Sequence, residues 1–247
     1  IYAIPLEILE EIFLNLPHHQ VVCICRLVCR QWKEVADSES LWIERCRREG
    51  YQPCHASRTP SDWREFYFLC KKRRNLIKNP RGDNAMKFWE IIANGGDRWN
   101  PEGLLFAHPN EEVKNNFVTS YQKCVKSQLI DLVNEGYSPS FLDDFQPDVR
   151  VSDWYAPRWD CGSEYEINVQ LLNENRHPIQ TFAPSKIYFE QWNDQKWQQI
   201  THVFQNYGPG ARYVQFTHGG KDRQFWAGWY GIRVTDSRVE ICPARDT

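Results

Sequence analysis

The spacing of apolar residues changes once along this 247-residue chain, close to Pro80. Before Pro80, apolar side chains recur at every third or fourth position, which is typical of amphipathic helices. After it they form short runs bounded by Gly, Pro, Asn and Asp, and the run from Tyr165 to Leu171 alternates with polar residues as a half-buried strand does. The chain is therefore predicted to be an α+β multidomain protein, a small all-α part followed by an antiparallel jelly-roll-like β-sandwich.

Three helices are expected in the first 50 residues, at 5–16, at 19–36 and from about 37–40 to 50. Pro17 ends the first of them and Gly50 ends the third. A fourth helix is expected after a capping box at 59–62, in which Thr59 caps the helix and Asp62 reaches back from the third position. A helical module of this size buries little surface, so we expect it to dock onto a partner.

These signals divide the chain into a helical module at 1–50, a helical linker at 51–80 and a sandwich at 81–247. About ten strands are expected in the sandwich. Besides the run at 165–171, the candidate strands are 87–92, 117–122, 127–133, 149–155, 179–182, 186–192, 197–204, 211–217, 224–230 and 238–241.

Composition argues against several classes of protein. No run approaches the 18 or more apolar residues of a membrane helix, so no membrane insertion is expected. Nine cysteines, an odd number, are scattered along a chain far larger than most disulfide scaffolds, which favours free thiols in the reducing cytoplasm.

Metal, cofactor and nucleic-acid binding are also not expected. His19 and Cys23 have helical spacing, but no second pair with zinc spacing completes a set of ligands. The basic run at 71–74 suits the end of a helix, and the rest of the sandwich is acidic and carries no nucleic-acid motif. Neither a phosphate loop nor a nucleophile elbow is present, so no catalytic residue is predicted.

The first 50 residues resemble an F-box. The similarity is carried by IPLEIL at 4–9, CRLVCRQW at 25–32 and Leu41-Trp42. It implies docking onto the Skp-type adaptor of a cullin-RING ubiquitin ligase, with the chain acting as a non-catalytic substrate receptor. The residues that this resemblance suggests for the adaptor contact are Pro5, Leu6, Leu9, Ile12, Phe13, Leu27, Val28 and Trp32.

Residues from about 63 to 242 resemble the F-box-associated domain of the sugar-recognising F-box proteins. Matching stretches include NGGD at 94–97, SQLIDL at 127–132, HGG at 218–220 and WAGWYG at 226–231. The resemblance implies recognition of the chitobiose core of N-glycans on misfolded glycoproteins destined for ER-associated degradation. Carried over residue by residue, it suggests Tyr121, Asp160, Phe225 and Trp226 for the sugar site, and it places Ala227 where the family has a lysine.

The residues themselves fit a sugar site. A sugar ring has weakly apolar faces and a polar rim, so aromatic side chains beside hydrogen-bonding groups suit it. If 224–230 is a strand, alternation lets only one face meet a ligand. We therefore expect Phe225 and Trp226 near the loop tip to be accessible, and Trp229 and Tyr230 to lie mostly in the core.

Two other functions stay open. The sandwich can instead bind a protein surface without sugar, within the same ligase. It can also act as a lectin-like scaffold outside the ligase.

Overall fold

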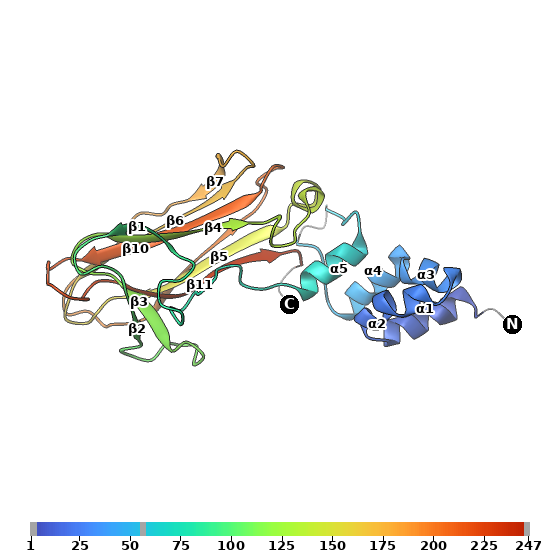
Figure 1. Ribbon diagram of the computed structural model, residues 1–247, viewed down its shortest axis with the longest axis horizontal. Helices are drawn as coiled ribbons and strands as arrows, with labels where there is room; N and C mark the ends of the chain where they lie inside the picture. The colour runs from blue at the N-terminus through green and yellow to red at the C-terminus, as the bar shows by residue number, and fades with distance from the viewer. Residues whose placement is uncertain (1–3, 55–57, 245–247) are drawn as a thin grey trace. The chain divides into compact units, whose positions relative to one another are not determined.

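The computed structural model describes residues 4–54 and 58–244, which form two compact units (Figure 1). One unit extends to Arg73 and includes the end of the chain from Cys242, and the other spans Arg74–Ile241. The sequence placed residues 74–80 with the helical linker. In the structure Leu76 N donates to Val239 O (2.8 Å) and Val239 N donates to Asn75 Oδ1 (3.0 Å), so this segment is tied to the sandwich.

The first unit is helical. Among its described residues are α1 (Leu6–Asn15), α2 (His18–Cys23), the short 3-10 helix η1 (Cys25–Leu27), α3 (Arg30–Ala36), α4 (Glu39–Arg48) and α5 (Trp63–Lys71). Leu9 and Phe13 of α1, one turn apart, are fully buried, as are Trp42 of α4 and Tyr67 of α5. The Trp42 and Tyr67 ring centroids lie 5.3 Å apart, so aromatic packing joins α4 to α5.

The single helix predicted at 19–36 is wrong, because two helices and a 3-10 turn occupy this segment. The chain leaves helical geometry at Ile24 (φ −122°, ψ −63°) and again at Cys29 (φ −160°, ψ 173°). The segment 21–25 contains three β-branched residues, which lower helix propensity. The break leaves Ile24, Leu27 and Val28 exposed to solvent.

The capping box predicted at 59–62 is also wrong. The helix α5 begins at Trp63, and Asp62 is its N-cap, with Oδ1 accepting a hydrogen bond from Glu65 N at 2.9 Å. Thr59 lies outside the helix. An aspartate at the N-cap satisfies one of the free N–H groups of the first turn. Asp62 therefore caps the helix by itself, without Thr59.

The second unit is a sandwich of two antiparallel sheets (Figure 1). Within the described residues one sheet has the order β1-β4-β10-β6-β7, with β8 also paired to β6, and the other has the order β2-β3-β11-β5-β9. The strands are β1 (Glu90–Asn94), β2 (Asn100–Gly103), β3 (Asn115–Val118), β4 (Cys124–Asp131), β5 (Asp148–Ala156), β6 (Ser163–Leu172), β7 (Pro178–Phe182), β8 (Ile187–Phe189), β9 (Gln198–Phe204), β10 (Tyr213–Asp222) and β11 (Arg233–Cys242). A short π-helix, η2 (Phe141–Phe145), precedes β5.

Most predicted strands are confirmed with shifted ends, and two differences matter. The strand β2 was missed, since its sequence NPEG has no apolar alternation. The strand predicted at 224–230 is wrong, because this segment is a loop between β10 and β11.

A buried polar group lies inside the sandwich, centred on Asp153 of β5. Its Oδ2 accepts from Tyr165 OH (2.7 Å) and lies 2.5 Å from His218 Nδ1, while its Oδ1 accepts from Ser237 Oγ (2.7 Å). All three partners are buried and come from three other strands. Burial lowers the pKa of His218 to about 4, against the opposing attraction of Asp153.

Candidate functional site

Loops from both sheets meet at one end of the sandwich. The pairing register places Asp222, the last residue of β10, opposite Ser163, the first residue of β6. Tyr155, near the end of β5, lies opposite Gln198 at the start of β9. Within the described part of the chain, this end therefore carries the loops 95–99, 119–123, 157–162, 190–197 and 223–232.

The loop 223–232 leaves the sheet directly after Asp222. The Asp222 carboxylate is buried and its Oδ1 accepts a hydrogen bond from Phe225 N at 2.6 Å. Burial raises the pKa of Asp222, and backbone N–H groups of the loop oppose that shift. Phe225 has φ +58°, a left-handed conformation that a strand does not contain. This side-chain-to-backbone turn is the local reason that the aromatic run does not continue β10.

The aromatic side chains of this loop are largely exposed. The exposed fraction is 67% for Phe225, 38% for Trp226 and 41% for Trp229. The accessibility expected of Phe225 and Trp226 is therefore confirmed. The burial expected of Trp229 is wrong, because that expectation assumed strand alternation, and Trp229 Nε1 instead donates to Arg98 O (3.1 Å) at the surface. Tyr230 is half-buried, with its ring edge-on to Trp226 at 5.5 Å.

Tyr121 comes to the same place from the loop 119–123. Its ring meets the Phe225 ring edge to face, with centroids 4.9 Å apart and an angle of 73° between the planes. Two residues 104 positions apart in the sequence thus form one aromatic wall, as the resemblance implies.

The backbone of the loop is held by residues that were not singled out from the sequence. Gly228 N donates to Asp97 Oδ2 at 2.5 Å, and Ser120 Oγ donates to Gly228 O at 2.7 Å. Ser120 Oγ also accepts from Asp97 N at 2.9 Å, which closes the group. The NGGD motif contains Asp97, so the sequence did draw attention to this residue. That Asp97 holds the loop at Gly228 could be seen only in the folded chain.

Asp160 lies beside this cluster and is paired with a cation. Arg158 Nε contacts Asp160 Oδ1 at 2.7 Å, and the Arg158 guanidinium lies 4.5 Å from the Tyr230 ring centroid. The structure therefore brings Asp160 toward the aromatic loop through Arg158 and Tyr230. The Asp160 side chain is mostly buried, and its Oδ1 is already paired with Arg158.

A buried cation supports the loop from below. Arg233 is almost fully buried and donates to Trp229 O (3.1 Å) and Gly231 O (3.2 Å). Its Nε lies 2.9 Å from Glu102 Oε1. Burial lowers the pKa of Arg233, and the attraction of Glu102 opposes that change. Arg233 was not predicted as a site residue, since one arginine at the start of a strand gives no sequence signal.

The predicted adaptor-contact residues divide into two groups. Pro5, Leu6, Ile12, Leu27 and Val28 are exposed, Leu27 at 75%, and Trp32 is partly exposed. Leu9 and Phe13 are fully buried and pack the core of the module, where the Phe13 ring meets Trp32 at 5.4 Å, so of the two roles open to them, internal packing is the one observed. Exposed apolar side chains of this unit that were not assigned to the adaptor contact include Ile4, Ile8, Ile24 and Ile43.

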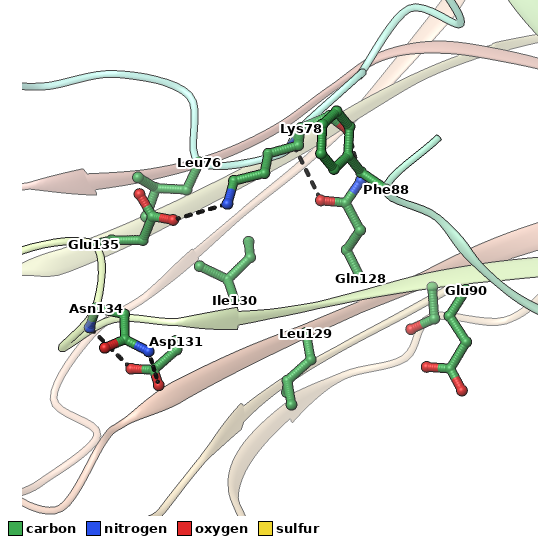
Figure 2. A pocket seen from close by; sticks show the side chains of 11 residues that line it. Leu76, Lys78, Phe88, Glu90, Gln128, Leu129, Ile130, Asp131, Asn134 and Glu135 are labelled. Carbon is green, nitrogen blue, oxygen red and sulfur yellow. Dashed lines mark hydrogen bonds and ion pairs between the residues drawn. The ribbon is translucent and has the colours of Figure 1, made fainter. Parts of the chain in front are cut away.

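A hollow of about 330 Å³ lies against β4 (Figure 2). Figure 2 shows Lys78 reaching along one wall toward Glu135, with Phe88 and Gln128 nearby. Phe88 is 52% exposed. None of Tyr121, Asp160, Phe225 or Trp226 lines this hollow.

Two observations concern other classes of site. Among the described side chains, no group of three or more His, Cys, Asp or Glu is placed to hold a metal ion. Of the helices in residues 4–54 and 58–244, none is both long and apolar enough to cross a membrane.

Two family models match the chain. A model described as F-box-like matches residues 1–48, and one described as F-box associated region matches residues 67–241. The chain therefore belongs to the family of F-box proteins with an F-box associated region, the substrate-receptor subunits of ubiquitin ligases.

Similar proteins span nearly the same length. F-box only protein 6 of Bos taurus is 49% identical over 245 residues, which cover 98% of this chain and 92% of that protein. F-box only protein 44 of Homo sapiens is 44% identical over 247 residues, covering 98% of this chain and 97% of that protein. Among solved structures, a family 22 carbohydrate binding module of Clostridium thermocellum Xyn10B covers 68% of this chain and 94% of that chain, at 5% identity and a TM-score of 0.41.

Proposed function

We propose that this chain is the substrate receptor of a Skp–cullin–F-box ubiquitin ligase and recognises the chitobiose core of N-glycans on misfolded glycoproteins in the cytoplasm. The helical module docks on the Skp-type adaptor, and the loop end of the sandwich holds the sugar. Ubiquitin transfer then needs no catalytic residue in this chain, because a receptor acts by raising the local concentration of its substrate.

The observation that carries the sugar proposal is the contact between Tyr121 and Phe225, with the exposed Trp226 next to Phe225 in the chain. The Tyr121 and Phe225 rings come from two loops and meet edge to face, and Trp226 is 38% exposed. The backbone of the loop that carries Phe225 and Trp226 is held by hydrogen bonds with Asp97 and Ser120. A sugar needs an aromatic face for its C–H groups and nearby polar groups for its hydroxyls, and this cluster supplies both.

The test is a calorimetric titration of the full chain with chitobiose. Saturable binding is expected, with a loss of at least tenfold in affinity for Phe225→Ala and for Trp226→Ala. Phe88→Ala is the matched control, since Phe88 is a similarly exposed phenylalanine in the hollow of Figure 2 and not in the loop cluster. No saturable binding at millimolar sugar, or binding that survives Trp226→Ala, would contradict the proposal.

The adaptor proposal rests on the exposed apolar side chains around the break between α2 and α3. Leu27→Asp places a charge on a side chain that is 75% exposed, so it spares the module core, unlike a change at Leu9. We expect co-purification with the adaptor to be lost. Leu105→Asp, at another exposed leucine in the sandwich unit, is expected to leave the complex intact. A complex that persists with Leu27→Asp would refute this docking surface.

A second candidate function is recognition of a protein surface without sugar. Ala227 favours it, because this exposed residue lacks the donor that the resemblance places there, and the hollow of Figure 2 offers another surface. This alternative predicts equal binding of glycosylated and deglycosylated forms of one unfolded protein. It also predicts that Phe88→Ala weakens that binding, while Phe225→Ala leaves it unchanged.

A further inference from the structure

Two exposed tryptophans form a separate surface at the loop end of the sandwich. Trp159 belongs to the loop 157–162 and Trp192 to the loop 190–197, and their exposed fractions are 49% and 66%. Their ring centroids lie 5.1 Å apart with 50° between the planes. Tryptophan is usually well buried in folded proteins, so two adjacent indoles facing solvent point to a ligand.

This tryptophan pair is built rigidly. Asn193 Nδ2 donates to Arg158 O and to Glu190 O, both at 2.9 Å, and Asn193 N donates to Trp159 O at 3.0 Å. The two loops are thus joined directly beside the indoles. Trp192 itself has φ +63°, a conformation that is costly for a bulky residue and persists only where surrounding contacts enforce it.

The tryptophan pair is surrounded by ion pairs, in which each charged side chain lies beside one of opposite charge. Arg223 Nη1 contacts Glu190 Oε1 at 2.5 Å, and the Arg223 guanidinium lies 5.5 Å from the centroid of the exposed Tyr188 ring. Asp194 pairs with Lys196 at 3.1 Å. Arg223 and Lys196 each lie beside an acidic partner, so this surface offers hydrogen-bond donors and acceptors in neutralised pairs, which suits an uncharged ligand with many hydroxyl groups.

The pair is connected to the proposed sugar site on two sides. Arg158 precedes Trp159 in the chain, pairs with Asp160 and lies against Tyr230. Arg223, which contacts Glu190, lies two residues before Phe225 in the aromatic loop. Arg158 and Arg223 therefore link both loops of the tryptophan pair to the loop 223–232.

We propose that Trp159 and Trp192 form a second stacking surface that binds the outer sugar rings of an N-glycan, beyond the two rings of chitobiose. This inference rests on the proposed sugar-binding function and deepens it: the receptor selects glycans that retain sugars outside the chitobiose core.

The test compares two uncharged ligands on the full 247-residue chain, chitobiose and the branched pentasaccharide that adds three mannoses to it. The wild-type chain is expected to bind the pentasaccharide about tenfold more tightly, as one or two aromatic contacts allow. Trp192→Ala and Trp159→Ala are expected to remove that gain and leave chitobiose affinity unchanged, which also shows that the variants are folded. Trp192→Phe, which keeps an aromatic face, is expected to retain most of it.

The outcomes separate the two proposals. If the wild-type chain binds neither ligand, the proposed sugar function fails and this inference fails with it. If chitobiose binds and the pentasaccharide binds no more tightly, only this inference is overturned. It is also overturned if Trp192→Ala weakens the binding of both ligands equally.

Discussion

Ala227 allows the sugar proposal to be tested by gain of function. The residue is exposed between Trp226 and Gly228, and the backbone next to it is held because Gly228 N donates to Asp97 and Gly228 O accepts from Ser120. A lysine at this position projects from a fixed point without entering the core. Ala227→Lys therefore restores the donor of the family pattern at little expected cost to stability.

The size of the gain follows from two opposing contributions. A hydrogen bond from a charged donor contributes about 1.5–3 kcal/mol. Ordering an exposed lysine side chain costs up to about 1.5–2 kcal/mol. The net gain is about 1 kcal/mol, so chitobiose affinity is expected to rise about fivefold in Ala227→Lys.

The assay is a calorimetric or NMR titration with chitobiose, run on wild type, Ala227→Lys and Ala227→Met. Methionine has an unbranched side chain like that of lysine but carries no donor, so it separates hydrogen bonding from added contact area. Equal gains for lysine and methionine, or no gain for lysine, would refute the placement of position 227 at the sugar hydroxyls.

Three further predictions concern the scaffold. Asp153→Ala leaves His218, Tyr165 and Ser237 without their buried acceptor. We therefore expect the free energy of unfolding to fall by about 3–5 kcal/mol and the Tm, measured by calorimetry, to fall by about 10 °C. A loss under about 1 kcal/mol would argue against the buried network. Because burial lowers the pKa of His218 to about 4, the unfolded chain takes up a proton first as the pH falls. Stability is then lost between about pH 6.5 and 4, by about 3 kcal/mol from this group, and His218→Gln should flatten that part of the Tm–pH curve. Asp62→Ala removes the N-cap of α5 and should cost about 1 kcal/mol in urea unfolding, whereas Thr59→Ala should cost little; the reverse order would restore the capping box.

The helices and most strands were predictable because their signals are local. The 3.6-residue period places Leu9 and Phe13 on one buried face, and the period of two places Tyr165 and Val169 in the sandwich core. The interruption between α2 and α3 was missed because apolar residues at helical spacing continue through Cys25 and Val28, even though the backbone leaves the helix at Ile24. Periodicity reports which face is apolar, and it does not report where the backbone turns.

The candidate site was predictable only in part. Tyr121, Phe225 and Trp226 were identified through resemblance, and the structure brings Tyr121 and Phe225 into contact. Trp229 was misassigned because strand alternation was assumed where a side-chain-to-backbone turn at Asp222 ends the strand. Asp97, Ser120 and Arg233 were missed, because hydrogen bonds to a distant loop backbone leave no trace in local spacing.

The sequence by itself determined the division into a helical part and a β-sandwich, and it named the aromatic run at 225–230. Those features depend on spacing within a few residues, which is readable along the chain. A local turn at Asp222 ends the strand before this run, and the tertiary structure decided how the resulting loop is held, since the contact that holds Gly228 comes from Asp97, 131 residues earlier. It likewise decided that Trp159 and Trp192 stand together, because only strand pairing brings their loops to one end of the sandwich.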